Sequence, residues 1–265
     1  MTAVRDFNGY GEELERLLQL RTSPIAIRLL GRERDIPKGA IRPKRDLGCH
    51  LALCQGFAMS RRNKATIAML KEDHWCYLPV IAYGLAKPPG FFMQGNMFFK
   101  RSVADLKIAK RLVNTFPRLK FGKYVGIVSS PLRTANFRPD LVITYCNSNQ
   151  LRCLLTGMKY KKGEIVTSRL DPSGACIHCT VPVAQTGECQ VTIPCGGDRQ
   201  HALAQDDEMI FSVPSSKLGD LISGLRYLEK LGQGYSRYAP DMRPDYRLSD
   251  LYVKVSRMSG MDMDK

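Results

Sequence analysis

The second half of the chain alternates short apolar runs with longer amphipathic stretches, and this alternation restricts the possible fold more than any other feature. Strands are predicted for the apolar runs at 123–130, 140–146, 189–195 and 207–214. Helices are predicted for the stretches at 147–160, 198–205 and 215–232, the first with Asn147 or Ser148 as its N-cap. Strands that alternate with helices predict an α/β or α+β fold, here with a mixed sheet.

The first half shows the same elements in a looser arrangement. Residues 1–20, 48–62 and 102–116 have helical patterns, and 23–30 and 64–70 are predicted strands. The third of these helices is expected to have Ser102 as its N-cap and Asp105 at its third helical position. We also predict a short strand at 163–170 and a loop at 171–188.

Two segments of the chain resemble each other and indicate a possible internal duplication. "NMFFKRSVADLKIAKRLVNTF" and "EMIFSVPSSKLGDLISGLRYL" both show an apolar strand, a polar turn, a serine cap and an amphipathic helix. The length of 265 residues suits one large domain or two closely joined halves. We therefore expect a single cysteine-rich domain over 1–265, with two interleaved halves and a possible subdivision into 1–120 and 121–265.

Nine cysteines are many for a chain without signs of secretion. The N-terminal stretch has no apolar signal-peptide core, and there is no run of 18 apolar residues, so we expect a cytoplasmic protein without a membrane span. In that compartment an odd, scattered set of cysteines favours metal or redox chemistry over disulfides. The positions are 49, 54, 76, 146, 153, 176, 179, 189 and 195.

Cys146 and Cys195 share one context, because each closes a predicted strand and precedes a predicted helix. Ligands of α/β sheets gather outside the carboxyl ends of strands. The N–H groups that begin a helix stabilise a nearby thiolate. We therefore expect these two sulfurs to lie close together.

The glycines after Cys195 point to a bound group. Gly196 and Gly197 allow the backbone to approach an anion or a bulky cofactor, and Arg199 offers a forked cation to it. Asp198 is expected to cap the helix that follows. These residues form the predicted anion-binding part of the site.

Cys176 and Cys179 form a Cys-x-x-Cys motif that admits three interpretations. A structural zinc could use both with Cys189 and Cys195, although the second pair lacks the spacing of a zinc ribbon. A thioredoxin-like dithiol would need a following helix, which the sequence does not predict. An iron–sulfur cluster accepts ligands scattered along the chain, as they are here.

The first half adds three cysteines. Cys49 and Cys54 would stand about 140° apart on a regular helix, so one of them at most should reach a given site unless the helix begins between them. Cys76 lies in "EDHWCYLP", beside Trp75 and His74. His74 could be a ligand or an acid–base group, but a loop histidine bonded to solvent or backbone is the commoner case.

The net charge of +15 limits the partners. It suits an acidic redox partner protein or an anionic small molecule. Nucleic acid is not expected, because aromatic residues are not interleaved with the basic ones and no helix-turn-helix or RNP-like pattern is present. Between residues 21 and 64, eleven Lys or Arg accompany three acidic residues, Glu33, Asp35 and Asp46.

Several stretches together resemble domain-of-unknown-function family 169, a cysteine-rich family described mainly from archaea and anaerobic bacteria. They are "SPIAIRLL", "LCQGFA", "EDHWCYLPVIAYGL", "PDLVITYCNSNQLRCLL" and "GACIHCTVP" through "TGECQVTIPCGGDR" to "DDEMIFSVPSSKLGDLISGL". The resemblance covers roughly residues 10–235. It implies that the characteristic cysteines are Cys54, Cys76, Cys146 and Cys195, with one or both of Cys176 and Cys179. Cys49 and Cys153 are additional, and "YLPV" after Cys76 departs from the family's usual small residue and glycine.

We therefore expect an iron–sulfur protein, most simply with a four-iron (4Fe–4S) cluster, in a redox, electron-transfer or cofactor-maturation role of anaerobic metabolism. Its candidate ligands are Cys54, Cys76, Cys146, Cys176, Cys179 and Cys195. One alternative is an enzyme without a cluster, in which a thiolate at Cys195 or Cys146 attacks an anionic small molecule. Another is a zinc-stabilised, basic nucleic-acid-binding module.

Overall fold

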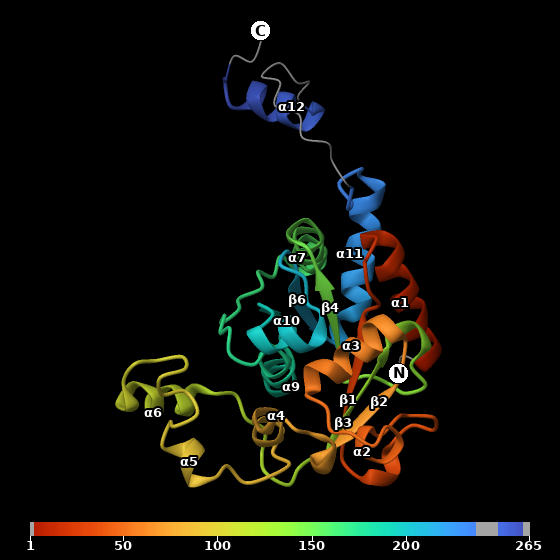
Figure 1. The fold of residues 1–265 in the computed structure, drawn as a ribbon. Coiled ribbons are helices and arrows are strands. Elements are labelled where there is room, and N and C mark those ends of the chain that lie inside the picture. The colour runs from red at the N-terminus through yellow and green to blue at the C-terminus, as the bar shows by residue number, and fades with distance from the viewer. Residues whose placement is uncertain (1–2, 237–248, 262–265) are drawn as a thin grey trace. The chain divides into compact units, whose positions relative to one another are not determined.

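Six strands form one sheet in the order β2–β3–β1–β4–β6–β5, and all neighbouring strands in it run antiparallel (Figure 1). The computed structural model describes residues 3–236 and 249–261 of the chain. The predicted α/β or α+β class is confirmed, but the mixed sheet was wrong, because every strand pair is antiparallel. The strands are β1 (Ile25–Leu30), β2 (Ile67–Leu70), β3 (Gly126–Pro131), β4 (Leu141–Cys146), β5 (Gln190–Thr192) and β6 (Met209–Pro214).

The sheet takes strands from both halves of the chain. β3 lies between β2 and β1, so the segments 1–120 and 121–265 are interleaved in one sheet. The chain divides elsewhere, into the compact units Met1–Tyr235 and Ser236–Lys265. The second unit contains helix α12 (Asp250–Met258), and the first contains the sheet.

Helices cover both faces of the sheet. One face packs against α1 (Val4–Leu18), α7 (Ser148–Lys162) and α11 (Leu218–Lys230). The other face carries α3 (Leu53–Asn63), α4 (Tyr77–Ala82), α8 (Ala175–His178), α9 (Val181–Thr186) and α10 (Gly196–Ala202). Short helices α2 (Pro43–Asp46) and α5 (Gly90–Met93) and the longer α6 (Leu106–Thr115) complete the unit.

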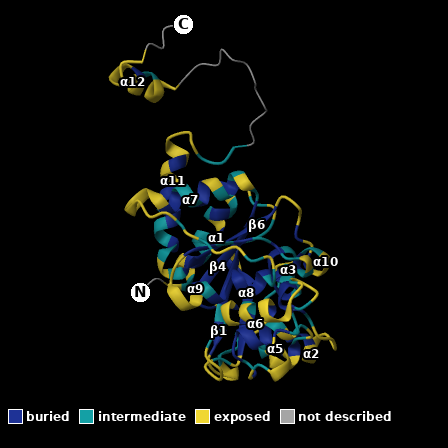
Figure 2. Cartoon of the chain, turned by 90° about the vertical axis from the view of Figure 1, so that its left-hand side faces the viewer, coloured by how far each residue is buried: buried dark blue, intermediate teal, exposed yellow. Residues whose placement is uncertain are grey.

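Side chains that alternate along each strand divide the interior into two cores. In β1, Ile25 and Ile27 enter the core under α3, whereas Ala26 and Leu30 enter the core under α1 and α11. β3 and β4 are buried along their whole length, and Figure 2 shows β4 dark between the helical layers. Successive residues of a strand therefore belong alternately to one core and to the other.

The helix caps were predicted with mixed success. Asn147 caps α7 as expected, since its side chain accepts the Gln150 N–H while the Gln150 side chain accepts the Asn147 N–H. Ser102 does not cap α6. Asp105 does so by accepting the Ile108 N–H, and a carboxylate there also complements the positive end of the helix.

Three local predictions were wrong. Residues 163–170 form no strand, and the predicted loop at 171–188 contains two short helices, α8 over the Cys-x-x-Cys motif and α9 after it. Turns occupy 95–98 where the first copy of the proposed duplication needed a strand, so the structure does not support an internal duplication. Aromatic residues raise the apolar content of that stretch without giving it strand alternation.

In the two described stretches of the chain, no helix combines the length and apolar character needed to cross a bilayer.

Helices α7 and α11 cross closely enough to require glycine. A β-carbon at Gly224 would lie 2.1 Å from the carbonyl oxygen of Gly157, which is backbone and cannot move aside. We predict that Gly224→Ala lowers the free energy of unfolding by about 3 kcal/mol, because the overpacked helices must separate.

The control is the same substitution at Gly9 in α1, where no atom lies within 4 Å of the added β-carbon. Gly9→Ala should raise the free energy of unfolding by about 1 kcal/mol through helix propensity. Urea denaturation measures both, and equal effects of the two substitutions would contradict the close crossing.

Candidate functional site

Four cysteines from four separate segments line a single cavity on the α3 side of the sheet. They are Cys54, Cys76, Cys176 and Cys195. All nine cysteines of the chain are free thiols. The cavity has a volume of about 450 Å³, within the range of small-molecule and cofactor sites.

Each of the four cysteines stands where a helix begins. Cys54 and Cys176 are the second residues of α3 and α8, and Cys76 and Cys195 are the N-caps of α4 and α10. The first N–H groups of a helix have no partner within it and can point at a nearby anion. The N–H of Asp198 does so toward the Cys195 sulfur, at 3.4 Å.

Cys54 ties two of these segments together. Its thiol donates to the carbonyl oxygen of Gly197, with an S···O distance of 3.8 Å. The helix begins at Leu53, between Cys49 and Cys54, so the two cysteines do not share a helix. Cys49 is exposed and does not line the cavity.

The four thiols differ in how far they are buried. Cys54 and Cys176 are each 6% exposed, whereas Cys76 and Cys195 are half-buried. Burial raises the pKa of Cys54, Cys76 and Cys176, because a thiolate loses hydration there. Neighbouring cysteines add to this effect for Cys176, since Cys54 and Cys195 would repel a second negative charge.

The walls of the cavity are mostly apolar, with two basic residues among them. Trp75, Met97 and Phe98 contribute the larger apolar surfaces, and Arg101 and His201 the basic groups. The Trp75 ring meets His201 edge-on at 5.4 Å. Trp75 adjoins Cys76 in sequence and was noticed for that reason, but nothing in the sequence linked Arg101 or His201 to the site.

Cys146 does not reach this cavity, which corrects the prediction that it lies beside Cys195. β4 and β5 both run antiparallel to β6, so the carboxyl ends of β4 and β5 do lie at the same end of the strands. The side chain of Tyr145 enters the core on the α3 side, and Cys146 therefore faces the opposite core. Its thiol donates to the Met209 carbonyl at 3.7 Å, and burial raises its pKa to about 12.

Cys179 lies behind the cavity rather than on its wall. It has no exposed surface and packs in the same core as Cys176. The peptide oxygen of Cys176 accepts from Tyr83 and Thr180, which fixes the turn between the two cysteines. Of the Cys-x-x-Cys motif, only Cys176 faces the cavity.

Of the predicted anion-binding residues, the two glycines line the cavity and Arg199 does not. Gly196 and Gly197 line the cavity, and a β-carbon at Gly196 would point into open space. Arg199 turns away and donates to the Gln205 carbonyl at 2.8 Å and to Asp206 at 3.2 Å. Cys195 occupies the N-cap position, so Asp198 does not cap α10 as predicted.

Asp198 instead belongs to a buried polar network under the cavity. It accepts a hydrogen bond of 2.9 Å from the Tyr145 hydroxyl, whose ring lies 3.9 Å from the Arg61 guanidinium. Arg61 is paired with Glu208 at 3.2 Å and donates to the Ala202 carbonyl at 3.1 Å. Burial raises the pKa of Asp198 to about 6, against the opposing effects of Tyr145 and Arg61.

His74 is not part of the cavity wall. Both of its ring nitrogens are buried without a hydrogen-bond partner among the described residues. Burial lowers its pKa to about 4, so the ring is neutral at physiological pH. The acid–base role considered from the sequence has no support in this geometry.

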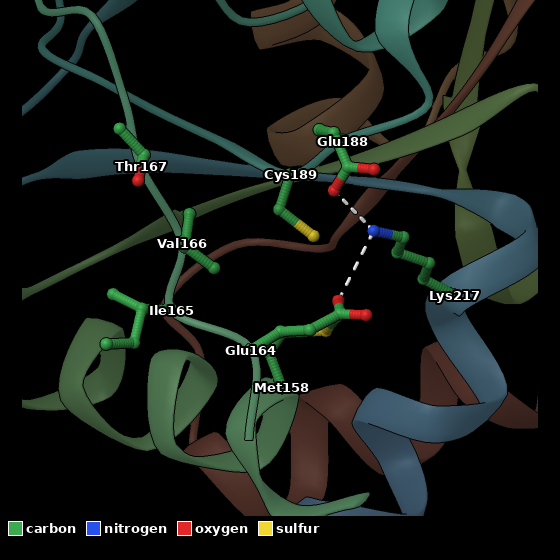
Figure 3. Close-up of a pocket in the computed structure, with 8 residues that line it drawn as sticks. All are labelled: Met158, Glu164, Ile165, Val166, Thr167, Glu188, Cys189 and Lys217. Carbon is green, nitrogen blue, oxygen red and sulfur yellow. Dashed lines mark hydrogen bonds and ion pairs between the residues drawn. The ribbon is translucent and has the colours of Figure 1, made fainter. Parts of the chain in front are cut away.

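A second cavity, of about 350 Å³, contains Cys189 (Figure 3). Lys217 lies there between Glu164, at 3.4 Å, and Glu188, at 2.5 Å. Cys189 packs in the core on the α1 side of the sheet, away from the core that holds Cys176. The zinc set of Cys176, Cys179, Cys189 and Cys195 is therefore not assembled.

Over residues 3–236 and 249–261, no three His, Cys, Asp or Glu side chains are arranged to hold a metal ion.

The buried Arg61–Glu208 pair generates a stability prediction. Arg61→Met should lower the free energy of unfolding by about 3–5 kcal/mol, because Glu208 keeps its charge in a buried place without a partner. Arg21→Met, which breaks the half-exposed pair with Asp207, should change it by less than about 1 kcal/mol.

Chemical denaturation of both variants measures the difference. The double variant Arg61→Met/Glu208→Gln should recover part of the loss, since it removes the unpaired charge as well. A double variant no more stable than Arg61→Met would contradict this explanation.

Thiol reactivity provides a second test. In metal-free protein at neutral pH, iodoacetamide should modify exposed Cys49 first and Cys54, Cys146 and Cys176 slowly, because raised pKa values keep these three protonated. Their rates should rise with pH as the thiolate fraction grows. Mass spectrometry of digested protein follows each site, with urea-unfolded protein as the control, and rapid neutral-pH labelling of Cys54 or Cys176 would contradict the prediction.

Comparison with known proteins places these features in a family context. The chain is 22% identical over 233 residues to an uncharacterised protein, MJ0308, of Methanocaldococcus jannaschii. The aligned region covers 86% of this chain and 97% of the relative. No solved structure matches the chain. Residues 13–224 match domain-of-unknown-function family 169 (DUF169), described as uncharacterised ArCR. The resemblance seen in the sequence is thereby confirmed, and the chain belongs to this family.

Proposed function

We propose that this protein binds an iron–sulfur cluster through Cys54, Cys76, Cys176 and Cys195 and uses it in electron transfer or a related redox step. The observation that carries the proposal is the meeting of four free cysteines, from four distant segments, around one cavity. Four thiolates complete the coordination shell of a four-iron cluster. Cys146 and Cys179, which were also candidates, are left out because they do not line the cavity.

The donor set and the cavity fit such a group. In a four-iron cluster each thiolate binds a different iron, so the sulfurs stand roughly 6–7 Å apart, further than the ligands of one ion. Ligands on the starts of four helices around a cavity suit this wider spacing better than a single zinc ion. The open space beside Gly196 leaves room for a bulky group against the backbone.

The protein would stabilise the negative charge of thiolate ligands through backbone N–H groups. That of Asp198 already points to the Cys195 sulfur, and Leu78 and Gln55 act on the Cys76 and Cys54 thiols in the same way. Hydrogen bonds to the sulfurs and exclusion of water are two means by which proteins set the potential of a cluster. The bound cluster would supply reversible one-electron chemistry.

Four protein ligands leave no iron open to a substrate, which favours electron transfer over catalysis at the metal. A role in cofactor maturation also remains compatible with this site. Nine free thiols are consistent with a reducing compartment, so a cytoplasmic location is part of the proposal.

The alternative of a thiolate enzyme without a cluster now depends on Cys195 alone. Cys146, its other candidate nucleophile, is buried on the far side of the sheet. The anion-binding role predicted for Arg199 has no support, because its side chain is bound to Gln205 and Asp206. Arg101 and His201 are the basic residues that a small anion would meet in the cavity.

Serine substitution tests the proposal directly. After anaerobic purification, Cys54→Ser, Cys76→Ser, Cys176→Ser and Cys195→Ser should each lose most of their iron and sulfide and the absorption near 400 nm, because a lost thiolate leaves one iron poorly held. Cys146→Ser and Cys153→Ser are matched controls, buried cysteines of the other core, and should retain the metal.

Circular dichroism of each variant separates loss of metal from loss of fold. Iron and sulfide in equal amounts indicate a cluster, whereas zinc in colourless protein would favour a structural ion. Full metal content in all four cavity variants would overturn the proposal.

A further inference from the structure

The segment 87–123 carries a run of unpaired positive charges near the cysteine cavity. It contains nine basic residues and a single acidic one, Asp105, which is engaged as the cap of α6. None of the nine forms an ion pair with any described residue. They are Lys87, Lys100, Arg101, Lys107, Lys110, Arg111, Arg118, Lys120 and Lys123.

The basic stretch 21–64, which the sequence singled out, is different. Arg21, Arg32 and Arg45 each pair with an aspartate. Arg42 pairs with three acidic residues, and Arg61 is buried against Glu208. Five of the eleven cations of that stretch are therefore paired within the fold, whereas none of the nine in 87–123 pairs with a described residue.

This segment adjoins the cavity. Met97, Phe98, Arg101 and Ser102 come from it and line the cavity wall beside the cysteines. Helix α6 begins four residues after Ser102, and Figure 2 shows it largely exposed. Lys107, Lys110 and Arg111 share one helix face at i, i+3 and i+4, opposite the buried Ala109 and Val113.

Exposed apolar side chains accompany the charges. Leu106 and Ile108 on α6 are 42% and 44% exposed, and Phe91 and Phe121 are exposed in the same segment. Apolar groups rimmed by charges are typical of protein interaction surfaces. The phosphate backbone of a nucleic acid gains little from aliphatic contacts, whereas an acidic protein can offer both carboxylates and apolar side chains.

We propose that α6 and the turn before it, residues 97–115, form a docking surface for an acidic electron-carrier protein beside the cysteine cavity. That the carrier is a redox protein rests on the proposed function, whereas its acidity rests on the unpaired cations. A partner held here would stand next to the wall formed by Phe98 and Arg101, close to the group that the cysteines hold. Electron-transfer encounters are small and short-lived, so charge attraction acts mainly on their association rate.

The test compares two triple variants with the same change of net charge. Lys107→Glu/Lys110→Glu/Arg111→Glu alters the proposed surface. Arg5→Glu/Lys159→Glu/Lys230→Glu alters exposed cations of α1, α7 and α11, in the other helical layer, that form no ion pair among the described residues. The probe is a small acidic two-cluster ferredoxin, and its association is followed by surface plasmon resonance with metal-free and with iron-loaded protein.

At low salt the α6 variant should associate about tenfold more slowly than the unaltered protein, and the control variant about as fast. The difference should shrink as salt rises from about 50 to about 200 mM, because screening shortens the range of the attraction. The milder Lys107→Gln/Lys110→Gln/Arg111→Gln variant should fall between, which guards against an effect of misfolding.

Equal slowing by both glutamate variants, or no association with the unaltered protein, would overturn the docking surface. So would an α6-dependent binding of single-stranded oligothymidylate without binding of ferredoxin, which would indicate a nucleic-acid surface instead. Iron content is measured on the same samples. If docking depends on α6 but the protein never holds iron, the cluster is refuted and the docking surface stands. If the protein holds iron but the α6 substitutions leave its association with ferredoxin unchanged, the docking surface is refuted and the cluster stands.

Discussion

The cysteine cavity depends on a charge that has no contact with water. The Arg61 guanidinium is fully buried, and a buried charge is tolerated only when it is paired and hydrogen-bonded. Its partners come from separate parts of the chain: Glu208 before β6, the Ala202 carbonyl at the end of α10, and the Tyr145 ring on β4. Since Arg61 belongs to α3, these contacts hold the helix of Cys54 against the helix of Cys195. Tyr145 extends the network to Asp198, whose own N–H reaches the Cys195 sulfur.

The sheet decides which cysteines can meet. Alternate side chains of each strand point to opposite faces of the sheet, and they pack into two separate cores. The helices on each face complete the core on that side. Cys54, Cys176, Cys179 and Cys195 belong to one core and Cys146, Cys153 and Cys189 to the other. A shift of one residue in the register of β4 would exchange Tyr145 and Cys146 and remove the support of Asp198. The register of the antiparallel pair between β4 and β6 is therefore part of the site.

Many elements of the fold could be predicted from the sequence, because the patterns that specify them are local. The six strands, most of the longer helices and the Asn147 cap follow from apolar periodicity and capping chemistry. Two of the cavity cysteines, Cys54 and Cys195, adjoin helices that were predicted. The sequence also shows that Tyr145 and Cys146, as neighbours in a strand, point to opposite faces of the sheet. Which of the two faces the cavity depends on the helices that cover each face, and these were not known.

Other features depend on contacts between distant segments and leave no local sign. Arg199 lies next to the glycines in sequence yet is drawn away by Gln205 and Asp206, whereas Arg101 reaches the cavity from a segment with no cysteine. The antiparallel order of the sheet could not be derived from alternating strands and helices, because that alternation usually accompanies parallel pairing. The ion pairs of Arg21 with Asp207 and of Arg61 with Glu208 likewise join residues more than a hundred positions apart and could not be predicted from the sequence.

The spacing of the cavity cysteines along the chain has a consequence for how the protein matures. Cys54 and Cys195 come from distant parts of the chain and lie together because α10 packs against α3. The set of four thiols therefore cannot be complete before a growing chain has reached Cys195. Under the proposed function, the cluster would join segments that lie far apart in the chain, in contrast to small zinc modules whose metal organises one short stretch. A cluster bound there would link four distant segments and stabilise the folded state selectively, and its loss would loosen the contact between α3 and α10.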